Sequence, residues 1–93
     1  MKATWHGKVI AESDRTHEVD GYRYFPREKV RMEMLRASPR TADDLQCPNG
    51  VQFYDVVEGP QCSPRAAWSY EKPGAGMKQV DRWIGFWNDV QVA

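Results

Sequence analysis

The sequence has no excess of charge of either sign. Its 93 residues contain 13 Lys and Arg against 13 Asp and Glu, and both halves of the chain are close to balance. Proteins that bind the phosphate backbone of DNA or RNA concentrate Lys and Arg on one face. The balance therefore argues against a dedicated nucleic-acid-binding module.

Long hydrophobic runs are also absent. A membrane-spanning helix needs about 20 consecutive apolar residues, and the first residues, MKATWHGKVIAESD, lack the apolar core of a signal peptide. We therefore expect a cytoplasmic protein that does not contact a membrane. The length is enough for one compact core and too short for two, so we expect a single domain over residues 1–93.

Cysteine is scarce. Cys47 and Cys62 are the only two, and in a reducing cytoplasm we expect free thiols rather than a disulfide. Together with His6 and His17 they have no regular metal-ligand spacing, so we predict neither a metal nor a cofactor. A catalytic thiol needs a nearby base, and His6 is a candidate partner for Cys47. The alternative is a small buried thiol that stabilises a turn.

Glycine and proline are frequent, with seven and six copies, and the apolar segments between them are short. Frequent turn-forming residues between short apolar segments are typical of a fold with many short strands. Asp20-Gly21 is the clearest hairpin turn, and Thr41 and Asp44 have the spacing of a helix capping box. We expect strands near residues 3–5, 8–11, 16–19, 22–25, 51–57, 66–70, 86–87 and 90–92, and short helical turns at 41–45 and 77–84.

The segment 26–36 is ambiguous. It consists of good helix formers, Pro26 suits a first helical position, and Val30 and Met34 lie one turn apart. As a strand, the same segment would place Met32 and Met34 on one face. Local propensity favours the helix and leaves the strand open.

Six short sequence segments occur in an order and spacing that resemble the domain of unknown function 427 family, over nearly the whole chain. The resemblance implies a mainly β fold, a small and strongly bent antiparallel sheet of the β-tent or partly open barrel kind, with one or two short helical turns. It favours a strand at 31–36. The six segments are 4–13 (TWHGKVIAES), 24–33 (YFPREKVRME), 47–50 (CPNG), 53–57 (FYDVV), 66–70 (AAWSY) and 84–92 (IGFWNDVQV).

The family is sometimes labelled nucleotidyltransferase-like. A nucleotidyltransferase site usually combines a Gly-Ser turn with paired aspartates that hold magnesium, and this chain has neither motif. The family also commonly carries a lysine in its Cys-Pro turn, where this chain has Asn49. The departure weakens any role for this turn in binding an anion.

Aromatic residues combined with Arg and Glu suggest a ligand site. On a strand, Arg31 and Glu33 would share a face, and a guanidinium binds carboxylate or phosphate through two hydrogen bonds. We predict that a small polar molecule, such as a nucleotide or a sugar, binds in a cavity lined by aromatic residues and Arg. The structural alternative is that the aromatics only anchor a small core and the charged pair is solvated. The candidate residues are Trp5, Tyr24, Arg31, Glu33, Cys47, Tyr54, Trp68 and Tyr70.

Two other functions stay open. One is a nucleotidyltransferase-like enzyme, as the family label implies. The other is a protein-interaction module or homodimer, because Trp83 and Trp87 are four residues apart and would share one face of a helix.

Overall fold

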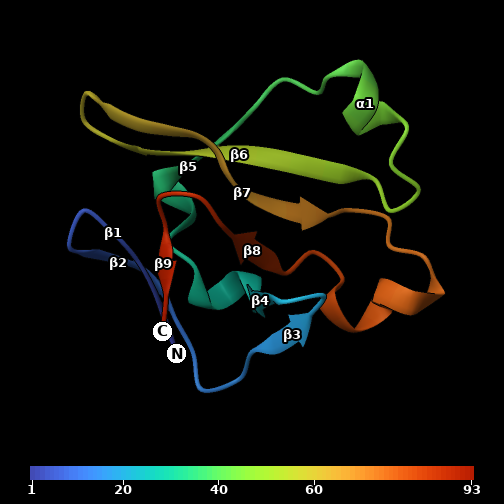
Figure 1. The fold of residues 1–93 in the computed structure, drawn as a ribbon, viewed down its shortest axis with the longest axis horizontal. Coiled ribbons are helices and arrows are strands. Elements are labelled where there is room, and N and C mark those ends of the chain that lie inside the picture. The colour runs from blue at the N-terminus through green and yellow to red at the C-terminus, as the bar shows by residue number, and fades with distance from the viewer.

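The computed structural model describes residues 1–93 as two antiparallel β-sheets connected by turns and short helices (Figure 1). One sheet has three strands in the order β2-β1-β9, and the other has six in the order β3-β4-β8-β7-β6-β5. The predicted small, mainly antiparallel β fold is confirmed, and no barrel closes because the edge strands β3 and β5 do not pair with each other. The strands are β1 (Lys2–Trp5), β2 (Lys8–Glu12), β3 (His17–Val19), β4 (Tyr22–Phe25), β5 (Leu35–Ala37), β6 (Val51–Glu58), β7 (Gln61–Tyr70), β8 (Ile84–Phe86) and β9 (Gln91–Val92).

The β3–β4 connection is the two-residue hairpin turn that the sequence predicts. Val19 pairs with Tyr22, and the intervening Asp20 and Gly21 have φ values of 54° and 86°. Positive φ at both central positions defines a type I′ turn, whose twist matches that of the flanking strands. The turn therefore fixes the direction in which Asp20 and the start of β4 project.

The long hairpin β6–β7 contains an irregularity that bends the larger sheet. The register shifts between Tyr54 and Val56, and Arg65 on the opposing strand has a φ of 55°. The side chain of Asp55 accepts a hydrogen bond from the backbone N–H of Arg65 at 3.0 Å. Such a bulge increases local twist and redirects side chains, and here it positions Arg65 beside the cavity described below.

The main hydrophobic core lies between the two sheets. Burying a large apolar side chain contributes about 1.5–3 kcal/mol, so this layer is the principal source of stability. A second, smaller hydrophobic cluster lies on the other face of the larger sheet and consists of Tyr24, Val51, Trp68 and Val80. The main core includes Trp5, Ile10, Phe25, Val56, Ile84 and Phe86, none more than 3% exposed.

The segment 26–36 is neither the helix of local propensity nor the strand of the family resemblance. It forms two 3₁₀ turns, η1 (Arg27–Lys29) and η2 (Met32–Met34), and becomes extended only at β5. The strand expected over 31–36 is therefore wrong for residues 31–34. Val30 and Met34, whose spacing favoured the helix, are nevertheless both buried, each 8% exposed.

A long-range contact explains this outcome. Val30 forms an isolated bridge with Ala11, and the backbone N–H of Arg31 donates to the carbonyl of Ile10 at 2.8 Å. Because Arg31 hydrogen-bonds to β2, it cannot continue a helical ladder through this point. Tertiary pairing thus overrides a propensity difference of a few kcal/mol at most over the segment.

The remaining helices are short. Helix α1 (Ala42–Leu45) has the capping box formed by Thr41 and Asp44, as predicted. The 3₁₀ helix η3 (Ala75–Val80) occupies part of the helix expected at 77–84, and it ends where Asp81 bridges to the backbone of Tyr70. None of these helices has the length and apolar character that spanning a bilayer requires.

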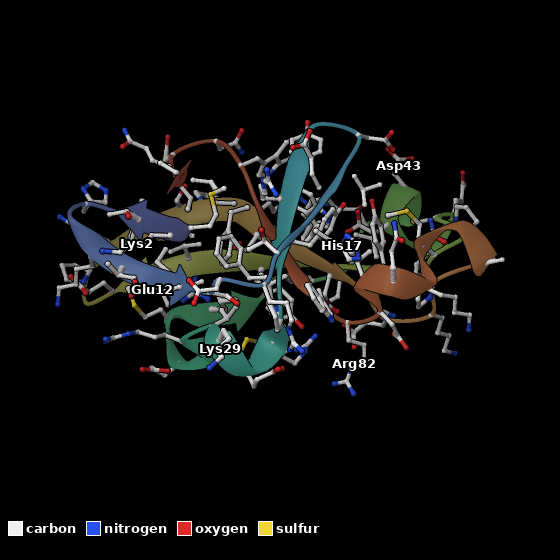
Figure 2. All side chains as sticks on the ribbon, turned by 90° about the horizontal axis from the view of Figure 1, so that it is seen from below. Lys2, Glu12, His17, Lys29, Asp43 and Arg82 are labelled. Carbon is white, nitrogen blue, oxygen red and sulfur yellow. The ribbon has the colours of Figure 1, made fainter.

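The N-terminal hairpin and α1 lie at opposite ends of the protein (Figure 1). Figure 2 shows Lys2 and Glu12 close together on that hairpin, with Asp43 of α1 at the far end. The amino group of Lys2 is 3.9 Å from the carboxylate of Glu12.

Candidate functional site

A cavity lined by aromatic residues opens on the face of the larger sheet that points away from the smaller sheet. It has a volume of about 200 Å³. Alternation along β7 places Trp68 and Tyr70 on this face and Ser69 on the other. The lining residues come from the β3–β4 hairpin, β6, β7, η3 and the segment after β8, and they are Asp20, Tyr22, Tyr24, Val51, Phe53, Trp68, Tyr70, Met77 and Trp87.

Trp68 forms the floor of the cavity. It is 5% exposed and pairs with Gly85 of β8, where an added Cβ would lie 2.8 Å from two carbons of the indole ring. The indole Nε1 donates a hydrogen bond to the hydroxyl of Tyr24 at 3.2 Å. Burial raises the pKa of Tyr24 far above its usual value near 10, so this hydroxyl stays neutral. The floor is therefore closely packed and its polar groups are paired.

The outer walls are aromatic and partly open to solvent. Tyr22 is 39% exposed and Trp87 is 37% exposed. The rings of Tyr22, Trp68 and Trp87 are close to mutually perpendicular, with interplanar angles of 89°, 81° and 70° and centroid separations between 5.2 and 6.2 Å. Edge-to-face contacts of this kind stabilise aromatic clusters beyond their buried area.

Arg65 positions two of these walls. Its carbonyl accepts a hydrogen bond from the Nε1 of Trp87 at 2.6 Å, and its guanidinium carbon lies 4.0 Å from the ring centroid of Phe53. The guanidinium in turn binds both carboxylate oxygens of Asp44, at 2.7 and 3.1 Å. Helix α1, which carries Asp44, is thereby connected to the rim of the cavity.

The carboxylate of Asp44 is 5% exposed and fully partnered. The hydrogen bonds from Arg65 lower its pKa, and this effect outweighs the increase that burial causes. Asp44 also accepts from the backbone N–H of Thr41 at 3.0 Å. The pair is charged at neutral pH and serves to hold the rim.

A second polar cluster lies on the reverse face of the sheet. The guanidinium of Arg27 donates to Glu71 at 2.9 Å, to Ser69 at 3.2 Å and to the carbonyl of Arg82 at 3.0 Å. Ser69 also donates to Glu71. Burial raises the pKa of Glu71, but the hydrogen bonds from Ser69 and Arg27 and the positive charges of Arg27 and Arg82 lower it overall. Because these groups satisfy one another, the cluster links η1 to β7.

Three of the eight predicted site residues line the cavity: Tyr24, Trp68 and Tyr70. Tyr54 does not, because its position on β6 turns it to the reverse face, where its hydroxyl lies 3.5 Å from Arg27. Trp5 is 3% exposed in the core between the sheets.

Arg31, Glu33 and Cys47 also lie outside the lining. Arg31 and Glu33 are exposed, because residues 31–34 form a turn rather than the strand that would have carried both side chains to one sheet face. No Lys or Arg lines the cavity, so its wall is aromatic without the predicted arginine. Cys47 packs against the outside of the smaller aromatic cluster.

The candidate pair of Cys47 and His6 does not form. His6 lies in the β1–β2 turn against Trp5, at a ring-centroid distance of 4.5 Å, whereas Cys47 follows α1 at the opposite end of the protein (Figure 1). Both cysteines are free, and no three His, Cys, Asp or Glu side chains gather in a metal-binding arrangement.

Sequence reasoning missed the outer half of the site. Strand alternation relates Tyr22 to Tyr24 and Phe53 to Val51, so these positions had a usable signal. For Asp20 the sequence predicts only a turn. The sequence points to Trp87 only as the end of a strand, or as part of an interaction surface if it shared a helix face with Trp83. In the structure the two residues flank the short strand β8.

The fold and cavity define a small, mainly β protein with an aromatic pocket on one sheet face. The chain belongs to the family described as a domain of unknown function (DUF427), whose sequence pattern matches residues 1–93. This agrees with the resemblance found in the sequence. No curated protein matches the chain.

Proposed function

We propose that this protein is a binding module that holds a small ligand in the aromatic cavity. The observation that carries the proposal is the cavity itself, a hollow of about 200 Å³ in which eight of the nine lining residues are hydrophobic. An apolar cavity of about 150 Å³ is large enough for a benzene-sized group. Small-molecule sites are typically concave, mostly apolar and equipped with a few polar groups.

The exposure of the walls supports a role beyond packing. The main core lies on the other side of the sheet, so stability does not require large aromatics at an open face. Tyr22 and Trp87 nevertheless remain more than one-third exposed. Their neighbours Trp68 and Tyr24 are buried and hydrogen-bonded to each other, and such preorganisation lowers the ordering cost of binding.

Among the lining residues, the three tyrosines carry hydroxyls and Asp20 carries a carboxylate. They supply orientation to a ligand whose apolar part contacts the rings. The nucleotidyl-transfer alternative has no comparable support, because Asp20 is the one carboxylate on the lining.

Binding is testable by nuclear magnetic resonance of the full chain. The four tryptophans give separate indole N–H signals, and Trp5, buried between the sheets, is an internal reference for Trp68 and Trp87. We expect members of a panel of small cyclic and ammonium compounds to shift the Trp68 and Trp87 signals without shifting Trp5. No shift with any compound would contradict the proposal.

A variant of an exposed wall residue tests the location. Tyr22→Ala removes one wall, and we expect it to weaken binding about fivefold or more. Leu45→Ala is the matched control, because Leu45 is an apolar residue 70% exposed on α1 and lies outside the lining. Equal affinities for the two variants would place the binding site elsewhere.

A further inference from the structure

The cavity carries one negative charge that the protein leaves without a partner. Asp20 lines the cavity, and none of the protein's ion pairs includes it. The type I′ turn with Gly21 holds its backbone in place. A carboxylate fixed at the rim of an apolar cavity attracts a cation and repels an anion.

No positive group of the protein offsets this carboxylate inside the cavity. The lining contains no Lys, Arg or His. Arg65 lies against the ring of Phe53, but its guanidinium is already bound by Asp44 at 2.7 and 3.1 Å. A phosphate or carboxylate ligand would therefore find no free cation, whereas a positively charged group would find Asp20.

The ring geometry favours a compact group over a flat one. A flat ligand stacked between two parallel rings needs about 7 Å between them, twice the usual 3.5 Å carbon contact. The most nearly parallel pair, Phe53 and Trp87, has its centroids 6.2 Å apart, which leaves no such gap. Instead Tyr22, Trp68 and Trp87 lie almost perpendicular to one another. Rings at such different orientations form a concave wall, which fits a rounded group better than a flat one.

We propose that the cavity binds a compact organic cation, such as a trimethylammonium group, with its charge against the aromatic rings and Asp20 as the counter-charge. The proposal rests on the binding function argued above and names the chemical class of the ligand. Aromatic faces attract cations within about 6 Å of a ring centroid, and desolvated cation–π contacts are the strongest. The methyl groups of such a cation can fill the apolar space, whereas a hydrated ammonium group would not contact the rings directly.

The decisive experiment compares a cation with its neutral isostere. Choline and 3,3-dimethyl-1-butanol have nearly the same shape, but only choline is charged. Titrated into the full chain, choline is expected to shift the Trp68 and Trp87 indole signals, with an affinity about tenfold or more above that of the alcohol. A peptide with trimethyllysine and its unmodified form, titrated in parallel, distinguish a protein-borne ammonium from a free one.

A pair of variants tests whether the carboxylate of Asp20 contributes to cation binding. Asp20→Asn is expected to weaken choline binding about threefold and to leave the alcohol unchanged. Glu18→Gln is the control, since Glu18 is an exposed carboxylate in the same hairpin that pairs with Arg23. Equal weakening by both variants would contradict the role of Asp20.

The outcomes separate the two proposals. Equal affinity for choline and the alcohol overturns the charge assignment and leaves the binding function standing. The same conclusion follows if only uncharged compounds of the panel shift the two indoles. If no compound shifts them, both proposals fail.

Discussion

The indole of Trp68 lies directly against the backbone of Gly85, its partner on the neighbouring strand. A Cβ at residue 85 would come within 2.8 Å of the indole carbons Cε2 and Cζ2 and 3.1 Å from a ring carbon of Tyr24. Distances this short are not tolerated without movement of a ring or a strand. The absence of a side chain at Gly85 therefore determines the position of the cavity floor.

Gly85→Ala should displace Trp68 and destabilise the protein. Overpacking a tightly packed site costs about 1–3 kcal/mol, and we expect a loss of free energy of unfolding in that range, measured by urea denaturation. Gly76→Ala is the control, because a Cβ there would meet no atom within 4 Å. The interpretation fails if the two variants are equally stable, or if the Trp68 indole signal is unchanged in Gly85→Ala.

Tyr24 should make the protein less stable at alkaline pH. Burial raises its pKa in the folded state well above the value near 10 that it has when unfolded. The unfolded chain therefore loses this proton first, and the stabilising contribution is complete below pH 10 and declines as pH rises above it. Chemical denaturation between pH 8 and 11 should show a steeper loss for the wild type than for Tyr24→Phe.

The same substitution has a cost at neutral pH. Tyr24→Phe removes the acceptor of the Trp68 indole N–H, which is buried. A buried donor without a partner costs about 1–3 kcal/mol, so the variant should be less stable than the wild type at pH 7. Identical stability at pH 7 would show that water or another group replaces the hydroxyl.

Local sequence determines a large part of the fold. The Asp20-Gly21 turn, the capping box of Thr41 and Asp44, and strand alternation along β7 all depend on interactions within a few residues. These features are predictable because residue type restricts φ or a side chain reaches its own backbone. They correctly place Trp68 and Tyr70 on one sheet face.

The choice between the two faces of a strand is not local. Alternation separates Phe53 from Tyr54, but only the position of the smaller sheet decides which of them faces the cavity. Arg31 was misplaced for a related reason, since its conformation follows from the hydrogen bond to Ile10, 21 positions away. Trp87 depends on the carbonyl of Arg65, 22 residues earlier. Local sequence patterns do not indicate hydrogen bonds between residues this far apart in the chain.

The Arg27–Glu71 pair should contribute more to stability than a surface ion pair. Both side chains are 25% exposed, and Glu71 also accepts from Ser69, which is fully buried. Glu71→Gln should cost about 1 kcal/mol. Glu28→Gln, which breaks an exposed ion pair to Arg15, should cost less than about 0.5 kcal/mol. Urea denaturation of both variants provides the comparison, and a reversed order would contradict a structural role for the cluster.

The Asp44–Arg65 pair, which holds the cavity rim, should make the free energy of unfolding decrease at low pH. The pKa of Asp44 is lowered in the folded state, so the unfolded chain binds this proton first as pH falls. Its stabilising contribution is present above the unfolded value near 3.8 and is lost as pH drops through the lower, folded value. Asp44→Asn should therefore flatten the decrease in stability below pH 4, measured by urea denaturation across the acidic range.

At neutral pH, Asp44→Ala removes the acceptor of the Thr41 backbone N–H, which is one half of the capping box, and the acceptor of the Arg65 guanidinium. We expect a cost of about 2–3 kcal/mol. Asp43→Ala is the matched control, since Asp43 is the exposed neighbour on the same helix and should cost less than about 0.5 kcal/mol. Because Arg65 also contacts Phe53 and holds Trp87, only Asp44→Ala should shift the Trp87 indole signal. An unchanged Trp87 signal in a folded Asp44→Ala variant would show that the rim is held without the ion pair.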